Sequence, residues 1–301
     1  MKLYAGIDGG QSSTVALIAD ERQTILGHGV SGPCDHIGQP ADSPRFAHAL
    51  EDAIGAALQE AALPPDSTFE AVVAGISGYE GAIHGIAPKL NAPRVVYLHD
   101  AQIAHAGAFE LGAGIIVIAG TGSVAYGRDA RGGEMMVGGW GYLFGDGGSA
   151  FSIVAKSLSV AMQLEDAGQI SWLDAHALQY FKRSSLREIA RAFYTGEIDR
   201  PHLASFAAEL LRLAETGGKD ERMVPYLEAM ELVELVRACA NCLGYADEPI
   251  DVALCGGTFG SAWYREATAE GIGRYLPSAN VVSARHDPVT GALLLAYKEG
   301  R

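Results

Sequence analysis

Cysteine and positive charge are scarce in this chain, and long apolar runs are absent. Its 301 residues include 4 cysteines, too few for a disulfide framework, so we expect a reducing, cytoplasmic environment. Only 22 lysines and arginines face 36 acidic residues, and the formal net charge is -14. This negative net charge argues against nucleic acid as a partner, because phosphate backbones bind basic surfaces.

Membrane segments are not expected either. No stretch approaches the roughly 20 apolar residues that a membrane span needs. The first apolar run is interrupted by Asp8 and by glycines, which is unlike a signal peptide. We therefore expect no membrane association. Together with the negative net charge, this leaves small molecules as the expected partners.

Glycine, in contrast, is abundant, and two glycine-rich turns are the most informative features of the chain. Residues 6–14 and residues 115–124 each contain an apolar run, a turn of Gly, Ser or Thr, and the start of another apolar run. Each reads as a strand, a hairpin and a strand. Glycine lets the backbone approach a ligand, and successive N–H groups form an anion nest. Two such hairpins predict a nucleotide-binding cleft between duplicated halves.

The two turns supply the predicted nucleotide-binding residues. They are Asp8, Gly9, Gly10, Gln11, Ser12, Ser13 and Thr14 in the first turn, and Thr121, Gly122 and Ser123 in the second. A carboxylate at Asp8 would face phosphates, so it would need a metal ion between them. The alternative is that Asp8 only forms the turn before two glycines.

The order of predicted elements is the same in both halves, which predicts an α/β fold of two related domains. The first half has strands at 2–8, 13–19, 23–30, 70–76 and 94–98, with helices at 43–62, between the last two strands, and at 101–109. The second has strands at 114–119, 123–128, 134–138, 251–255 and 280–282, helices over most of 146–245, and helices from 258 and at 287–298. We expect domains at 1–108 and 109–285, the second with a helical insertion, and a terminal helix at 286–301 that packs on the first domain.

Asp100 is the predicted catalytic base. It lies at the carboxyl end of a predicted parallel strand, where ligands bind in open α/β sheets. A hydroxyl that attacks a γ-phosphate needs an acceptor for its proton. The alternative is that Asp100 only caps the next helix.

Two further loops could contact a ligand. Residues 138–150 are rich in glycine and contain Trp140, Gly141 and Asp146, an aromatic residue and a carboxylate that suit a sugar. Here the alternative is that Asp146 caps the following helix. The second loop, Gly256, Gly257 and Thr258, joins a strand to a helix and would let a base or ribose lie against the backbone.

These motifs together resemble the BadF/BadG/BcrA/BcrD-type ATPase family, in its N-acetylglucosamine kinase-like branch. The resemblance covers nearly the whole chain and rests on ordered motifs: Asp8-Gly9-Gly10, Ser77-Gly78, Asp100-Ala101, Gly120-Thr121-Gly122-Ser123, and Trp140-Gly141 through Asp146 to Ser149. It implies two duplicated actin-like, ribonuclease H-like ATPase domains, with ATP and Mg²⁺ as cofactors. The implied reaction phosphorylates the 6-hydroxyl of an amino sugar, with N-acetylglucosamine expected first. A homodimer is also expected.

By resemblance, Asp100 falls on the catalytic base and the Gly256-Gly257 turn on the adenosine motif. The implied sugar contacts are Asp35, His36, Ser77, Gly78, Asp100, Thr121, Gly122, Trp140, Gly141 and Asp146. The chain departs from the family pattern in two places. Gln11, Ser12 and Ser13 replace Gly, Thr and Lys in the first turn, which removes one positive charge. Asp35 replaces a sugar-binding asparagine, and its carboxylate could accept from hydroxyls or pair with a free amine.

Several alternatives remain open from the sequence. Glucosamine could be the substrate, or the chain could be a family ATPase without sugar kinase activity. Dehydratase activators of this family hold an iron–sulfur cluster with cysteines, whereas this chain has Gly147 near the corresponding place and no cysteine between Cys34 and Cys239. A sugar-responsive repressor would carry a DNA-binding domain before the first turn, and we expect none. A non-catalytic sugar sensor is the remaining alternative.

Overall fold

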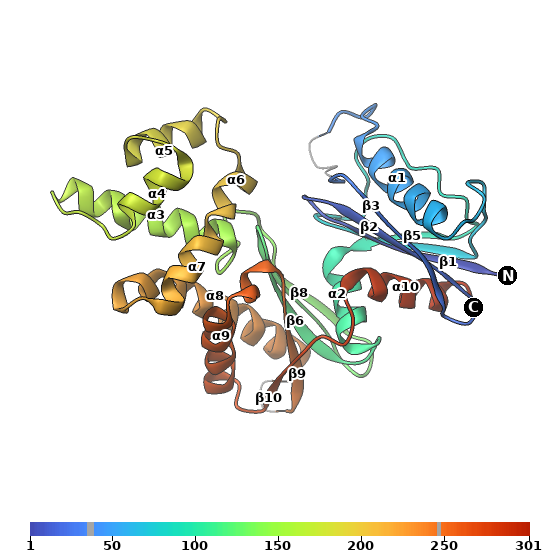
Figure 1. Ribbon diagram of the computed structural model, residues 1–301. Helices are drawn as coiled ribbons and strands as arrows, with labels where there is room; N and C mark the ends of the chain where they lie inside the picture. The colour runs from blue at the N-terminus through green and yellow to red at the C-terminus, as the bar shows by residue number, and fades with distance from the viewer. Residues whose placement is uncertain (35–38, 246–247) are drawn as a thin grey trace. The chain divides into compact units, whose positions relative to one another are not determined.

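The computed structural model describes residues 1–34, 39–245 and 248–301. The chain divides into two compact units (Figure 1). The first contains residues 1–116, 130–132 and 283–301, and the second contains residues 117–129 and 133–282. Each unit is built on a five-stranded mixed sheet. Within the described residues, no helix is long and apolar enough to cross a membrane.

The first sheet begins as an antiparallel meander and ends in parallel strands. Strands β1 (Leu3–Gly9), β2 (Thr14–Asp20) and β3 (Ile25–Ser31) form the meander. Strand β4 (Ala71–Ile76) pairs in parallel with β1, and β5 (Val95–His99) pairs in parallel with β4. The order is β3-β2-β1-β4-β5, so the carboxyl ends of β1, β4 and β5 meet at one edge.

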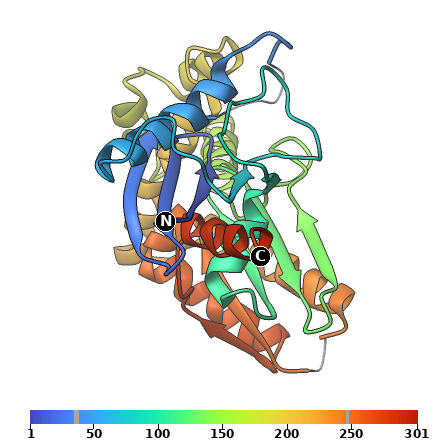
Figure 2. The same ribbon diagram turned by 90° about the vertical axis from the view of Figure 1, so that its right-hand side faces the viewer.

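Helices cover both faces of this sheet (Figures 1 and 2). Helix α1 (Arg45–Glu60) lies on one face, while α2 (Asp100–Phe109) and α10 (Pro288–Glu299) pack together on the other. Side chains alternate between the two faces along each strand, so β1 contributes to both cores. Leu3, Ala5 and Ile7 pack with Phe46, Leu50 and Ile54 of α1, whereas Tyr4 packs with Ile103, Leu293 and Tyr297.

The second sheet repeats the topology of the first. Its strands are β6 (Gly114–Ala119), β7 (Ser123–Arg128), β8 (Glu134–Gly138), β9 (Ile250–Cys255) and β10 (Ala279–Val282). The order β10-β9-β6-β7-β8 is that of the first sheet read from the opposite edge, with β6 in the place of β1. This confirms the predicted duplicated fold.

A group of helices between β8 and β9 enlarges the second unit. They are α3 (Ala150–Asp166), α4 (Asp174–Phe181), α5 (Leu186–Tyr194), α6 (Arg200–Ser205), α7 (Ala207–Thr216) and α8 (Lys219–Leu243). Helix α9 (Ala262–Tyr275) lies beside α8, and α8 packs on β7 and β8. The fold therefore contains the predicted helical insertion.

Two predicted helices differ in the structure. The helix expected between β4 and β5 is wrong, because residues 77–94, all described, contain none. Gly78, Gly81 and Gly85 have positive φ angles there, which a regular right-handed helix does not accommodate. The helix expected from Thr258 begins only at Ala262, after the single 3₁₀ turn η1 (Gly257–Gly260).

Candidate functional site

The first predicted phosphate turn is a short hairpin between β1 and β2. Its ends are closed by a hydrogen bond from the Gly10 N–H to the Ser13 carbonyl at 2.9 Å, and residues 11–13 are exposed. Thr14 differs from its neighbours because it is fully buried and its hydroxyl donates to the Gly32 carbonyl at 2.9 Å. The serines therefore present hydroxyls to solvent, whereas the Thr14 hydroxyl anchors the turn.

Asp8 lies at the end of β1, just before this turn. Burial raises the pKa of Asp8 to about 7, and the negative charges of Asp100 and Asp287 add to the effect. Asp287 caps α10 by accepting the Thr290 N–H at 2.9 Å. A carboxylate with this pKa, close to two others, would gain from a cation that neutralises them. No three metal-ligating side chains converge within the described part of the chain, so such a cation would need further ligands.

Asp100 directly follows β5 and is the first residue of α2. Its neighbour His99, not Asp100, is the cap of the helix, since the His99 Nδ1 accepts the Ala101 N–H at 3.1 Å. The alternative role of Asp100 as the helix cap is therefore wrong. The same Nδ1 lies 2.7 Å from the Asp100 Oδ1. At this distance the imidazole is within ion-pair range of the carboxylate. The Asp100 Oδ1 is buried, and no hydrogen bond to it is formed by the described residues. It is therefore a candidate proton acceptor.

Ser77 and Gly78 follow β4 directly. The Ser77 N–H donates to the Gly9 carbonyl at 2.9 Å, and Gly78 has a φ of 73°. Both residues are therefore placed beside the first turn. The predicted sugar contacts Asp35 and His36 lie outside the described residues.

The second predicted turn joins β6 to β7. It is closed by the Gly120 N–H, which donates to the Gly122 carbonyl at 2.9 Å. Ser123 is held from the loop that follows β8: its N–H donates to the Asp146 Oδ1 at 3.2 Å and its hydroxyl to the Gly147 carbonyl at 2.7 Å. Thr121 remains half-exposed. The turn is thus held by the loop that follows β8, and the Ser123 hydroxyl already donates its proton to Gly147.

The turn after β9 lies directly against the end of β6. The Thr258 hydroxyl donates to the Ala119 carbonyl at 2.8 Å. Gly256 has a φ of 105°, and a Cβ there would lie 2.4 Å from the same oxygen, so only glycine fits. Gly257, in contrast, faces open space. The structure therefore brings the predicted base or ribose turn next to the predicted phosphate turn.

Asp146 and Trp140 differ sharply in exposure, although they share one loop. Trp140 is 77% exposed, whereas the Asp146 side chain is 5% exposed. Asp146 does not cap α3, because the cap is Ser149, whose hydroxyl accepts the Ser152 N–H at 3.1 Å. The Asp146 Oδ2 instead accepts from Arg200 at 2.7 Å.

Sequence reasoning missed Arg200 and Asp287. Arg200 follows the helix cap Asp199, which is an ordinary helix start, and lies 54 residues from Asp146. Asp287 precedes a proline and also reads as a helix start. Nothing in either local pattern indicates a second partner.

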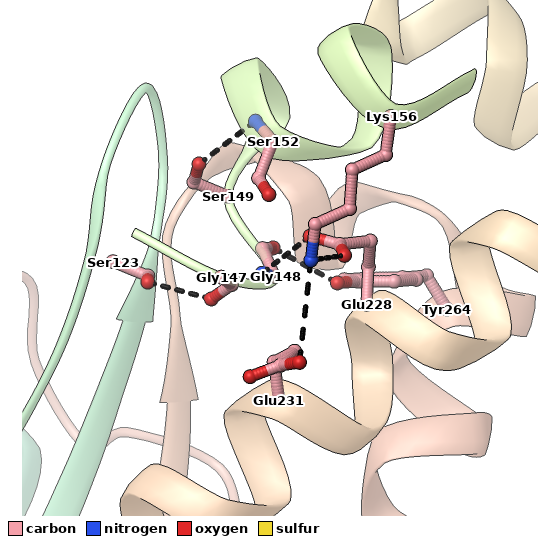
Figure 3. A network of polar contacts seen from close by, with 9 residues as sticks. All are labelled: Ser123, Gly147, Gly148, Ser149, Ser152, Lys156, Glu228, Glu231 and Tyr264. Carbon is pink, nitrogen blue, oxygen red and sulfur yellow. Dashed lines mark hydrogen bonds and ion pairs between the residues drawn. The ribbon is translucent and has the colours of Figure 1, made fainter. Parts of the chain in front are cut away.

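Side chains of two helices hold Gly148, and a third helix pairs with one of them (Figure 3). Glu228 of α8 is fully buried, accepts the Gly148 N–H at 2.8 Å and pairs with Lys156 of α3 at 2.5 Å. The Tyr264 hydroxyl of α9 donates to the Gly148 carbonyl at 2.8 Å. Gly148 has a φ of 83°. The loop that holds Ser123 is therefore itself attached to the helical layer.

Glu228→Ala should destabilise the protein by about 1–3 kcal/mol, because the buried Gly148 N–H loses its acceptor. Glu228→Gln keeps an acceptor oxygen and should lose less. Glu231→Gln is the matched control, since Glu231 is 56% exposed and lies 4.0 Å from the same Lys156 nitrogen. Urea unfolding measures all three, and equal losses for Glu228→Ala and Glu231→Gln would contradict this role.

Comparison with known proteins identifies the family. The family model "BadF/BadG/BcrA/BcrD ATPase family" matches residues 5–296. The chain belongs to this family. It is similar to the N-acetylmuramic acid/N-acetylglucosamine kinase of Clostridium acetobutylicum, with 26% identity over 99% of both chains. This confirms the resemblance inferred from the sequence motifs.

Solved structures match over the same length. A candidate N-acetylglucosamine kinase from Chromobacterium violaceum has a TM-score of 0.81 and 25% identity, over 98% of this chain and 99% of that one. A ROK family glucokinase from Streptomyces griseus, solved with glucose and AMPPNP, has a TM-score of 0.59 and 16% identity, over 98% of this chain and 99% of that one. The second similarity shows the fold alone.

Proposed function

We propose that this chain is an ATP-dependent kinase that phosphorylates the 6-hydroxyl of an amino sugar, with N-acetylglucosamine as the preferred substrate. The observation that carries the proposal is the buried Oδ1 of Asp100, just past the carboxyl end of a parallel strand, which accepts no hydrogen bond from the described residues. Matches along the whole chain to proteins named as amino-sugar kinases support the substrate class.

The proposed reaction assigns Asp100 as the general base. Its free Oδ1 would accept the proton of the sugar 6-hydroxyl while that oxygen bonds to the γ-phosphorus of ATP and ADP leaves. A carboxylate on a rigid strand end, with one oxygen free of hydrogen bonds, suits this role. The sugar contacts proposed in the same unit are Ser77 and Gly78, together with Asp35 and His36. In the second unit the proposed sugar contacts are Trp140 and Gly141.

In the first unit, the phosphates of ATP would bind against the turn at 9–14. In the second unit, the turn at 120–123 is the proposed phosphate contact and the turn at 256–258 is the proposed adenosine contact. Residues 11–13 are exposed, so their backbone N–H groups could donate to phosphate oxygens. Asp8 would hold a magnesium ion, directly or through water, and this ion would neutralise phosphate charge. The raised pKa of Asp8 and its two carboxylate neighbours fit a cation at this place.

A substrate screen tests the proposal. The purified protein, ATP and Mg²⁺ are mixed with glucosamine, N-acetylglucosamine, N-acetylmuramic acid or glucose, and ADP release is followed. We expect release that depends on an amino sugar, with the phosphate located on the 6-oxygen by NMR. ATP hydrolysis that no sugar stimulates would instead favour a family ATPase without kinase activity.

Substrate choice should depend on Asp35. We expect wild type to have a higher kcat/KM for N-acetylglucosamine than for glucosamine, because a carboxylate can accept from neutral sugar hydroxyls. If Asp35 pairs with a protonated 2-amine, loss of one member of a buried pair costs on the order of 3–5 kcal/mol, and glucosamine would be strongly preferred. A wild-type preference for glucosamine that Asp35→Asn reverses would overturn the N-acetylglucosamine assignment.

A further inference from the structure

The Arg200 guanidinium contacts both the second phosphate turn and the loop behind it. Its Nη2 donates to the Asp146 Oδ2 at 2.7 Å and to the Thr121 carbonyl at 3.3 Å. Asp146 in turn accepts the Ser123 N–H through its other oxygen. Arg200 is therefore connected to the residues on both sides of Gly122, once directly and once through Asp146.

Two aromatic rings orient this guanidinium. The Cζ of Arg200 lies 5.2 Å from the ring centre of Tyr142 and 5.8 Å from that of Phe151. A planar guanidinium can stack on rings and donate hydrogen bonds from its edge at once, which an ammonium group does less well. The position therefore suits arginine.

No spare room remains between the turn and this ion pair. A Cβ at Gly122 would lie 2.9 Å from the Asp146 Oδ2 and 3.1 Å from the Arg200 Nη2. Residues 119–124 contain no lysine or arginine of their own. Arg200 thus brings positive charge to a turn that otherwise offers only backbone and hydroxyl donors.

We propose that Arg200 is a positioning residue for the nucleotide phosphates. Through Asp146 and the Thr121 carbonyl it holds the turn at 120–123 in the arrangement that binds phosphate, so the start of α6 controls nucleotide affinity. This inference rests on the proposed function for its ligand. The arrangement of the turn itself does not depend on which sugar is phosphorylated.

Hydrogen exchange and nucleotide binding test the proposal on the full-length protein. The variants are Arg200→Met, Arg200→Lys, Asp146→Asn and the double variant; asparagine tolerates the φ of 61° at position 146. Arg212→Met is the matched control, because Arg212 pairs with Glu209 at the same 2.7 Å but on the exposed surface of the insertion.

Arg200→Met should speed amide exchange in peptides covering 119–124 and 143–149 by about tenfold, and weaken ADP binding by about as much, the scale of one hydrogen bond to a charged group. The KM for ATP should rise more than the KM for the sugar, and Arg200→Lys should recover part of each loss. The double variant should lose no more than the worse single variant. Arg212→Met should match wild type in every measurement.

Wild-type exchange rates in Arg200→Met, or additive losses in the double variant, would overturn the proposal. These outcomes are separate from failure of the proposed function. If wild type phosphorylates no sugar, that function fails, while the exchange comparison still decides whether Arg200 holds the turn.

Discussion

Asp100→Asn should reduce sugar phosphorylation by about 10²-fold or more, while the fold and ATP binding persist. An amide cannot accept the hydroxyl proton, and a positioned general base contributes on this scale. The buried Oδ1 of Asp100 receives no hydrogen bond from the described residues, so little native structure depends on it. Turnover, nucleotide affinity and melting temperature are measured together.

The control for Asp100→Asn is Asp174→Asn. Asp174 is also the first residue of a helix, α4, so both changes remove the same favourable interaction with a helix N-terminus. Asp174→Asn should leave turnover unchanged. Wild-type turnover in Asp100→Asn would contradict the assignment of the base.

Asp8→Asn should weaken Mg²⁺-dependent nucleotide binding by about tenfold or more, since a neutral amide oxygen replaces a negatively charged carboxylate oxygen. The wild-type affinity should also increase from about pH 6 to pH 8. Burial and the charges of Asp100 and Asp287 raise the pKa of Asp8 to about 7, and a metal ligand must lose its proton first. Titration of Mg²⁺ and ADP across this range measures both effects, and Asp8→Asn should lose the pH dependence.

Stability without metal should change in the opposite direction with pH. An aspartate has a pKa of about 4 in an unfolded chain, so between pH 4 and 7 the native state holds a proton that the unfolded state has released. Wild-type stability should therefore fall as pH rises through this window, and Asp8→Asn should be at least as stable as wild type at pH 8. A large loss of stability in Asp8→Asn with normal nucleotide binding would favour a turn-forming role alone.

Asp287→Asn offers a second control for the same site. Asparagine caps a helix about as well as aspartate, so α10 should keep its start. One of the charges that raise the pKa of Asp8 disappears. The pH dependence of Mg²⁺ binding should therefore shift to lower pH. An unchanged midpoint would show that burial and the charge of Asp100, without Asp287, raise the pKa of Asp8.

Local pattern was enough to predict the strands and the turns between them. Every predicted strand is present in the structure. Short apolar runs bounded by turn residues such as glycine are typical of strands and too short for most helices. The places of Asp8 and Asp100 followed in the same way, since each lies at the end of a predicted strand: Asp8 ends the run from Leu3, and Asp100 follows the run 95–98 after His99. The repeated order of elements also predicted the duplication that the two strand orders confirm.

Helix starts and the segment at 77–94 were less predictable. His99 and Ser149 cap the helices that Asp100 and Asp146 were candidates to cap, because several polar residues near a helix start can each satisfy its free N–H groups. The helix expected between β4 and β5 is absent from residues 77–94, all of which are described. Glycines with positive φ replace it in the structure.

The sequence by itself determined the strand-and-turn framework, the family, and the carboxylates at the strand ends. Only the tertiary structure decided which residues from distant parts of the chain contact or affect the site residues. Arg200 meets Asp146, Glu228 meets Gly148, and Asp287 affects Asp8 across long stretches of chain. Spacing along a strand or helix reports only on neighbours within a turn or two, whereas these contacts depend on how helices of the insertion and the terminal helix pack on the sheets.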